Sequence, residues 1–172
     1  YASSSGIGWM KMVPKRWRPS AMERLLGRTP DNIPDAKISS FPWFGFRYGR
    51  RLRDAMSKPE RVDAHLWAGE RFNLLLIDAI GDRWGEIDAV YTFNTAGLEI
   101  LQAVSDHNVK GIVEQTIAPS AYERKLIRED AARHPGWEFV ETQDDARLKA
   151  YAKREQAEWE AADAILCGST FV

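Results

Sequence analysis

The chain has 172 residues, with 24 Lys and Arg against 25 Asp and Glu, so its formal net charge is -1. Hydrophobic residues make up 44% and charged residues 28%, a composition of folded globular proteins that argues against disorder or a fibrous repeat. The near-neutral charge also excludes a protein that holds nucleic acid through bulk positive charge. A chain of this length buries roughly 70% of the surface that its unfolded form exposes, so we expect one sizeable core.

Three features bear on location and completeness. No apolar run is longer than that from Leu74 to Ile77, which is far shorter than the ~18 residues that a membrane span needs, and no apolar segment of a signal peptide stands near the N-terminus. The single cysteine, Cys167, cannot form an internal disulfide. These features favour a cytoplasmic protein, with the inner face of the membrane as a further option. Because the chain starts at Tyr1 and ends at Val172 without a terminal tail, we expect a fragment of a longer protein.

Charge and proline divide the chain. Residues 1–60 hold 12 basic and 5 acidic side chains, a balance of +7, and six of the eight prolines. Residues 61–172 hold 12 basic and 20 acidic side chains, a balance of -8. We therefore predict one incomplete domain, residues 1–172, with a loop-rich basic-aromatic part at 1–58 and a regular part at 59–172.

The first part mixes basic and aromatic side chains. They are Trp9, Lys11, Lys15, Arg16, Trp17 and Arg18, followed by the segment from Phe41 to Arg51. This mixture suits a peripheral contact with an anionic membrane or a phosphate-bearing ligand. The competing interpretation packs the aromatic rings in the core with arginines around them. Single-stranded nucleic acid could use the same residues, but the acidic remainder of the chain argues against it, so we expect no nucleic-acid partner.

From Pro59 the periodicity becomes regular. Apolar spacing predicts helices at 59–80, at about 120–134 and at 144–162, with a further helix whose apolar face is Leu98, Leu101 and Val104. Short β-branched, aromatic or aliphatic runs predict strands at 87–93, 111–116 and 164–167. Asn94 or Thr95 is the expected N-cap of the helix that follows the first strand.

This alternation of strands and helices predicts an α/β fold, a Rossmann-like parallel sheet with helices on both faces. The continuous apolar strands favour burial of both faces. Right-handed crossovers place the carboxyl ends of all strands at one edge of the sheet, where ligands bind in open α/β folds. The loops after the strands, which contain Asn94, Thr95, Gln115, Thr116 and Ser169, are therefore the candidate site.

Motifs for other chemistry are missing from the sequence. It contains no CxxC, HExxH, P-loop or GxSxG pattern, and its three histidines lack neighbours at ligand spacing, so we assign no metal site and no catalytic residue. Glu155 lies on the same predicted helix side as Leu148 and Trp159. Its carboxylate either reaches the edge of the sheet at the carboxyl ends of the strands, called the strand-end edge below, or lies at the margin of the buried apolar side of the helix.

The segment from Glu155 to Val172 resembles the end of the N-terminal domain of retaining glycosyltransferases with the GT-B fold, a family-4-like pattern. There a Glu-bearing helix leads into an AD-x-I-x-x-x-S-x-F-V strand, matched here from Ala162 to Val172. The strands DAVYTFNTAG and GIVEQTIAP look like that domain's other late strands. The resemblance covers residues 84–172 well and residues 1–83 weakly.

The resemblance implies the N-terminal, acceptor-binding half of an enzyme that moves a sugar from a nucleoside-diphosphate-sugar to an acceptor with retention of configuration. It implies no cofactor or metal beyond that co-substrate, an acceptor that is a glycan or a lipid-linked molecule, and a C-terminal domain that this segment lacks. That domain carries the E-x7-E motif, which is absent here. We expect this segment alone to be inactive. The nucleotide, the sugar, the acceptor and the oligomeric state stay open.

Carried over residue by residue, the resemblance makes Asn94, Thr95 and Ser169 cleft-lining residues. Helix capping or the satisfaction of strand ends is the competing role for each. Many members place a His that contacts the donor sugar where this chain has Gln115, followed by Thr116. Gln donates and accepts hydrogen bonds but cannot act as a charged acid. The rival hypothesis is a stand-alone Rossmann- or flavodoxin-like binding module without catalysis.

Overall fold

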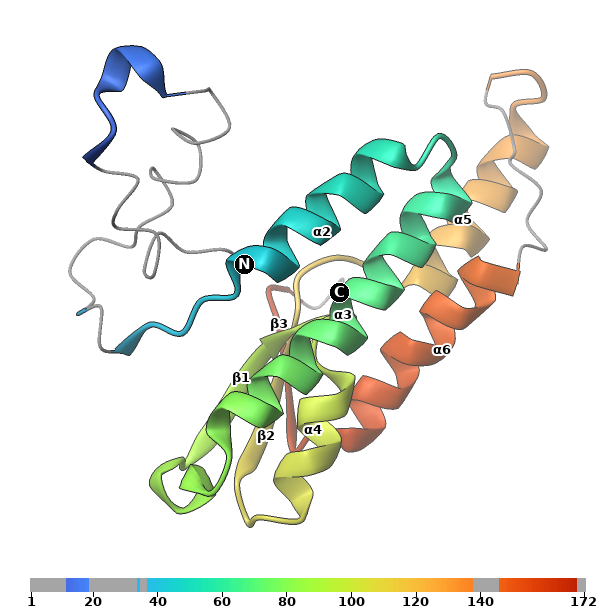
Figure 1. The fold of residues 1–172 in the computed structure, drawn as a ribbon. Helices are drawn as coiled ribbons and strands as arrows, with labels where there is room; N and C mark the ends of the chain where they lie inside the picture. The colour runs from blue at the N-terminus through green and yellow to red at the C-terminus, as the bar shows by residue number, and fades with distance from the viewer. Residues whose placement is uncertain (1–11, 19–33, 35–36, 138–145, 170–172) are drawn as a thin grey trace. The chain divides into compact units, whose positions relative to one another are not determined.

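The computed structural model describes residues 12–18, 34, 37–137 and 146–169. The chain divides into two units, residues 1–54 and 55–172. The first contains a short 3-10 helix, Lys15–Trp17, and helix α2, Pro42–Asp54. The second contains helices α3 (Lys58–Ile80), α4 (Leu98–Ser105), α5 (Ser120–Arg133) and α6 (Ala146–Ala161), with strands β1 (Ala89–Phe93), β2 (Lys110–Gln115) and β3 (Ala164–Cys167) (Figure 1).

The three strands form one sheet in the order β1-β2-β3, and both pairs are parallel. This confirms the α/β class and the parallel sheet, and every predicted strand lies within two residues of its expected bounds. The register pairs Phe93 with Glu114 and Gln115 with Cys167. The residues that follow the three strands therefore emerge at one edge of the sheet, as the alternation predicts.

Helix α3 shows how closely local signals set an element's bounds. Ser57 accepts a hydrogen bond from the Glu60 amide, while the Glu60 side chain accepts one from the Ser57 amide, which completes a capping box. Pro59 lies in the first turn, and Gly81, at a φ of 55°, ends the helix. The predicted helix at 59–80 is confirmed.

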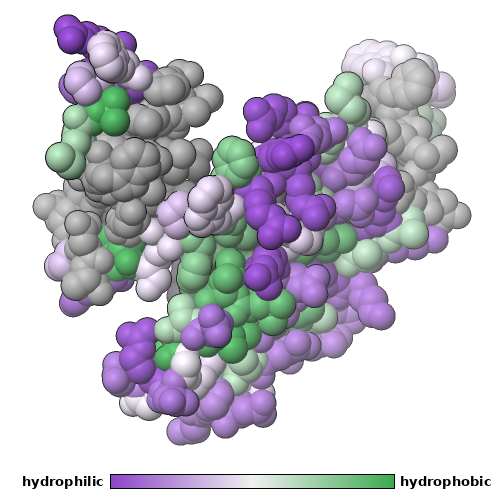
Figure 2. Space-filling model, in the orientation of Figure 1, coloured by the Kyte–Doolittle hydropathy of each residue, from purple (hydrophilic) through white to green (hydrophobic). Residues whose placement is uncertain are grey.

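The helices cover one face of the sheet. Helix α4 contacts β1 and β2, helix α6 contacts β2, and helix α3 packs on α4 and α6 (Figure 1). The core on this side is built from Trp84, Ile100, Val104 and Val109. A predominantly hydrophobic surface remains over the C-terminal half of α3, where Leu74 is 44% exposed (Figure 2).

On the opposite face of the sheet, no described helix of the second unit contacts the strands in the way that α4 and α6 do. Tyr91 and Phe93 on β1 and Leu166 on β3 are each about half exposed, and they share a face because strand residues alternate between faces. The prediction that strand composition buries both faces is therefore wrong for the described residues: these strands contact helices on one side. Tyr91 and Phe93 instead pack against each other edge to face, with ring centroids 5.7 Å apart.

One predicted motif residue has a structural role away from the strand ends. Asp163, just before β3, accepts hydrogen bonds from the Gly111 amide at 2.8 Å and from Lys110 Nζ at 2.9 Å. Both partners lie at the start of β2, and these bonds keep the pKa of Asp163 below its usual value. Asp163 thus fixes the register of β3 on β2 at the amino end of the sheet.

Candidate functional site

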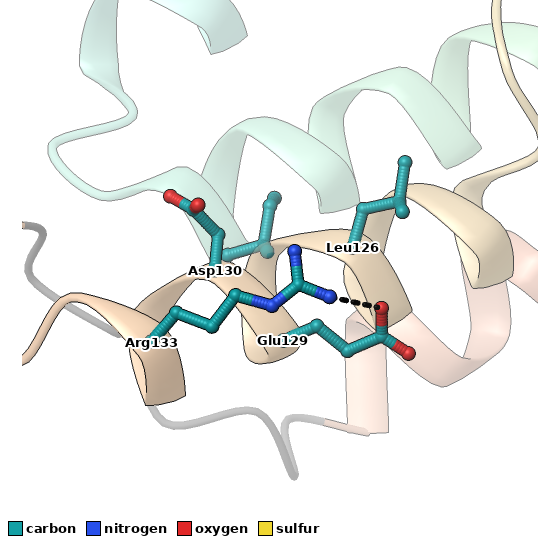
Figure 3. A pocket seen from close by; sticks show the side chains of 5 residues that line it. Leu126, Glu129, Asp130 and Arg133 are labelled. Atoms are coloured by element: carbon teal, nitrogen blue, oxygen red, sulfur yellow. Dashed lines mark ion pairs between the residues drawn. The ribbon is translucent and has the colours of Figure 1, made fainter.

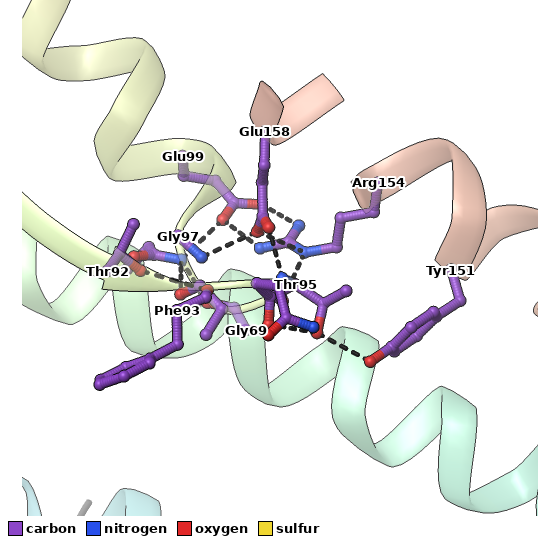
Figure 4. Close-up of polar contacts among 12 residues, drawn as sticks. Gly69, Thr92, Phe93, Thr95, Gly97, Glu99, Tyr151, Arg154 and Glu158 are labelled. Atoms are coloured by element: carbon purple, nitrogen blue, oxygen red, sulfur yellow. Dashed lines mark hydrogen bonds and ion pairs between the residues drawn. The ribbon is translucent and has the colours of Figure 1, made fainter. Parts of the chain in front are cut away.

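The loop after β1 is a strained backbone segment held by helix α6. Thr95 has a φ of 64°, a left-handed conformation that is unfavourable for a β-branched residue. Its amide donates to Glu158, its carbonyl accepts from Arg154 Nε at 3.1 Å, and its hydroxyl lies 2.9 Å from the Tyr151 hydroxyl (Figure 4). Three side chains of one helix therefore stabilise a conformation that the residue alone disfavours.

Glu158 also caps helix α4. Its side chain is 0% exposed, and Oε1 accepts a hydrogen bond from the Gly97 amide at 2.8 Å. Gly97 is the N-cap of α4 and offers no side chain of its own, so the buried carboxylate satisfies a helix-terminal amide that would otherwise lack a partner. The predicted capping by Asn94 or Thr95 is therefore wrong.

Burial and hydrogen bonding oppose each other at Glu158. Burial raises its pKa, while the amides of Gly97, Thr95 and Leu98 and the Arg154 guanidinium favour the ionised form. The balance puts the pKa at about 7. The carboxyl group at the N-terminus of α4 therefore changes its charge near neutral pH.

Arg154 links α6 to α4 through a bidentate ion pair. Its two terminal nitrogens lie 2.6 and 2.7 Å from the Glu99 oxygens, and its Nε lies 3.8 Å from Glu158. Burial raises the pKa of Glu99, but the hydrogen bonds from Arg154 outweigh this effect and lower it. Asn73 on α3 adds a bond to Glu99 at 3.0 Å. The positive charge of Arg154 is thus paired with carboxylates of the protein itself, mainly that of Glu99.

The loop after β2 is held in the same way by Glu155. This carboxylate, 1% exposed, accepts from the Ser120 amide at 2.8 Å, the Ser120 hydroxyl at 2.9 Å and Gln115 Nε2 at 2.9 Å. Ser120 is the first residue of α5, so Glu155 caps α5 as Glu158 caps α4. Of the two interpretations of Glu155, the structure supports the one in which the carboxylate reaches the strand-end edge.

Gln115 lies inside this network. Its side chain is 2% exposed, donates to Glu155 and to the Ile117 carbonyl, and accepts from Trp159 Nε1 at 3.0 Å. Both amide hydrogens and the carbonyl oxygen are therefore used within the protein. The predicted contact of Gln115 with a substrate stays a prediction; the structure gives this residue a role in holding the loop after β2.

Asn94 and Thr116 lie together on the accessible side of the edge. The Thr116 hydroxyl donates to Asn94 Oδ1 at 2.9 Å, and the backbone amide of Asn94 donates to the backbone carbonyl of Glu114 at 2.9 Å. Within the part of the chain that the structure describes, Asn94 Nδ2 has no hydrogen-bond partner. Ser169, which is exposed, follows the third strand at the same edge. The structure thus brings the three loops together, with neutral polar groups at the surface.

The contacts that sequence reasoning missed are those of Tyr151, Arg154 and Glu158, all on α6. Together with Glu155, which the sequence did single out, Tyr151 and Glu158 are spaced at i, i+4 and i+7 and so lie along one side of the helix. This is the side that also carries Leu148 and Trp159. Two glutamates within an apolar stripe were the available signal, because a carboxylate on a buried face requires donors opposite it.

Other sites are less developed. A concave region on α5 is lined by Leu126, Ile127, Glu129, Asp130 and Arg133 (Figure 3). All five belong to helix α5 itself, where Arg133 lies 3.8 Å from Glu129. Among the described residues, no three His, Cys, Asp or Glu side chains gather where a metal ion could bind, and no helix has the length and apolarity to cross a membrane.

Comparisons with family models, with curated proteins and with solved structures find no match for this chain.

Proposed function

We propose that this chain is the N-terminal, acceptor-binding part of a retaining glycosyltransferase with the GT-B fold. The enzyme would transfer a sugar from a nucleoside-diphosphate-sugar to a glycan or a lipid-linked acceptor in the cytoplasm. The proposal starts from the resemblance of the segment from Glu155 to Val172. The observation that carries it further is the chemistry of the strand-end edge.

The N-termini of helices in α/β folds commonly bind phosphate, because their free amides and dipole favour negative charge. Here the N-terminus of α4 binds the carboxylate of Glu158, and that of α5 binds the carboxylate of Glu155. The one guanidinium of this network, Arg154, pairs with Glu99. A pyrophosphate at these helix ends would displace buried carboxylates, so the nucleotide belongs to another part of the enzyme.

Neutral hydrogen-bonding groups remain at the accessible edge. Asn94 offers amide donors, and Thr116 offers a hydroxyl. Such groups match the hydroxyls of a sugar better than a charged phosphate. The proposal therefore assigns acceptor binding to this edge, and donor binding to a second Rossmann-like domain that carries the E-x7-E motif.

The test uses the full-length protein that contains this chain, supplied with UDP- and GDP-sugars. Asn94→Ala and Thr116→Val each remove one polar group at the edge, and we expect kcat/KM for the acceptor to fall by roughly 5- to 10-fold. Gln102→Ala, which removes an exposed amide on α4, is the matched control. Gln115 is unsuitable because its loss would disturb a buried network.

Unchanged kcat/KM in both edge variants would remove the acceptor assignment. Absence of sugar transfer by the full-length protein would favour the rival hypothesis, a binding module without catalysis.

A further inference from the structure

Helix α2 carries aromatic and basic side chains on one exposed face. Trp43 is 81% exposed and Phe46 is 61% exposed, and their rings pack edge to face with centroids 6.4 Å apart. At 3.6 residues per turn, Arg50 and Arg53 fall on the same side of the helix as these two rings. Both arginines are also exposed.

The other face of α2 is a separate apolar face. Phe44, Tyr48 and Leu52 recur at i, i+4 and i+8, and all three are buried or half-buried. The rings of Phe44 and Tyr48 stack with centroids 6.1 Å apart. Because the helix already buries this face, Trp43 and Phe46 are additional apolar groups that the helix presents to solvent.

The helix that carries this exposed face is strongly basic. Helix α2 contains four arginines and one acidic residue, Asp54, a balance of +3. Asp54 lies 3.5 Å from Arg50, and both side chains are more than 60% exposed. This ion pair therefore contributes little to stability and leaves both groups accessible. The two exposed rings are unfavourable in water, whereas the arginines are well hydrated. Together they complement a surface that is anionic and partly apolar.

We propose that the exposed face of α2 binds the headgroup region of an anionic lipid bilayer. Trp side chains favour the level of the headgroups, and Arg side chains pair with lipid phosphates while their stems lie along apolar surface. Each basic residue near such a surface strengthens binding roughly fivefold. The helix would lie on the membrane and would not cross it. This contact is independent of the proposed glycosyl transfer.

The experiment is co-sedimentation of the full chain with vesicles of phosphatidylcholine alone and of equimolar phosphatidylcholine and phosphatidylglycerol. The unmodified protein should bind the anionic vesicles more tightly than the neutral ones. The double substitution Arg50→Gln with Arg53→Gln should lower the partition coefficient by roughly 10- to 30-fold. Trp43→Ser with Phe46→Ser should also weaken binding, with a loss that persists at high salt, where the electrostatic part is screened.

The matched control substitutes two exposed basic residues of α5, Lys125→Gln with Arg128→Gln, which changes the net charge by the same amount. Its partition coefficient should stay within about twofold of the unmodified value, since these residues lie outside the proposed face. Far-UV circular dichroism identifies any variant that has lost its fold. Equal loss in the control, no preference for anionic vesicles, or binding to a single-stranded oligonucleotide without binding to vesicles would overturn the proposal.

Discussion

The carboxylate of Glu158 accepts a hydrogen bond from the backbone amide of Gly97 across 2.8 Å, although 61 residues separate the two. Glu155 makes the equivalent contact with the amide of Ser120, also at 2.8 Å. Two buried glutamates of α6 thus cap the N-termini of the helices that follow β1 and β2. Helix α6 is therefore the element that sets the geometry of the strand-end edge.

The raised pKa of Glu158 makes the stability depend on pH. Folding raises this pKa from 4.5 to about 7, so the folded state binds the proton more tightly than the unfolded state. The stabilisation by Glu158 is fully present below pH 4.5 and is lost as the pH rises to about 7. Glu158→Gln, which stays neutral, should lack this dependence.

Urea unfolding of both proteins at a series of pH values measures the effect. The free energy of unfolding of the unmodified chain minus that of the variant should fall by roughly 3 kcal/mol between pH 4.5 and 7 and then level off. Taking the difference cancels groups that both proteins share, including His65, whose pKa is lowered by burial and by Arg61. A difference that does not change with pH would contradict the assignment.

Removing the charge of Glu155 should destabilise the chain. Glu155→Gln replaces one acceptor oxygen with a donor facing the amide and hydroxyl of Ser120 or the amide of Gln115, and we expect a loss of roughly 1–3 kcal/mol. Glu160→Gln on the same helix, where the side chain is exposed, is the control and should change stability by less than about 0.5 kcal/mol. Chemical denaturation compares the two; similar losses would count against the buried cap.

The bidentate geometry of Arg154 should matter beyond its charge. Arg154→Lys keeps the charge but loses the paired bonds to Glu99, so we expect a loss of roughly 1–3 kcal/mol in the free energy of unfolding. The reverse change at the neighbouring exposed position, Lys153→Arg, should be nearly neutral. If the two substitutions had equal effects, the ion pair between Arg154 and Glu99 would not contribute as the structure indicates.

The close approach of α4 to β1 requires glycine at position 97. A Cβ atom on Gly97 would overlap the side chain of Thr92, so Gly97→Ala should lower the melting temperature by several degrees, in line with roughly 1–3 kcal/mol for overpacking. Gly85→Ala, where no atom lies within 4 Å of the added Cβ, provides the comparison. A melting temperature for Gly97→Ala that equals that of Gly85→Ala would show that the loop accommodates the methyl group.

Local patterns predicted the regular elements of the second unit because their signals lie within the elements. The capping box of α3 and the β-branched run of β1 are examples. Helix α2 was missed, since Gly45 and Gly49 interrupt the spacing of Phe44, Tyr48 and Leu52 in a segment that otherwise resembles a loop. The bounds of α3 and β1 can be predicted because their local signals agree. The presence of α2 could not be predicted because its local signals conflict.

The site was only partly predictable for a related reason. Parallel pairing alone placed Asn94 and Thr116 at one edge. The cap of α4 comes from a residue 61 positions away, and no local rule connects Gly97 with Glu158. The partly exposed face of the sheet also escaped prediction, because apolar strands such as β1 are compatible with burial on either one or two faces.

The most direct test of the strand-end geometry is an amide NMR titration of the 15N-labelled chain at pH 8, where Glu158 is mainly ionised. The amides of Gly97 and Ser120 report on the two helix ends. If Glu158 and Glu155 hold these positions, UDP and GDP should leave both signals unchanged, whereas Glu158→Gln should shift the Gly97 signal without any ligand. Saturable shifts of Gly97 and Ser120 on addition of either nucleotide would contradict the claim, because the helix ends would then bind phosphate.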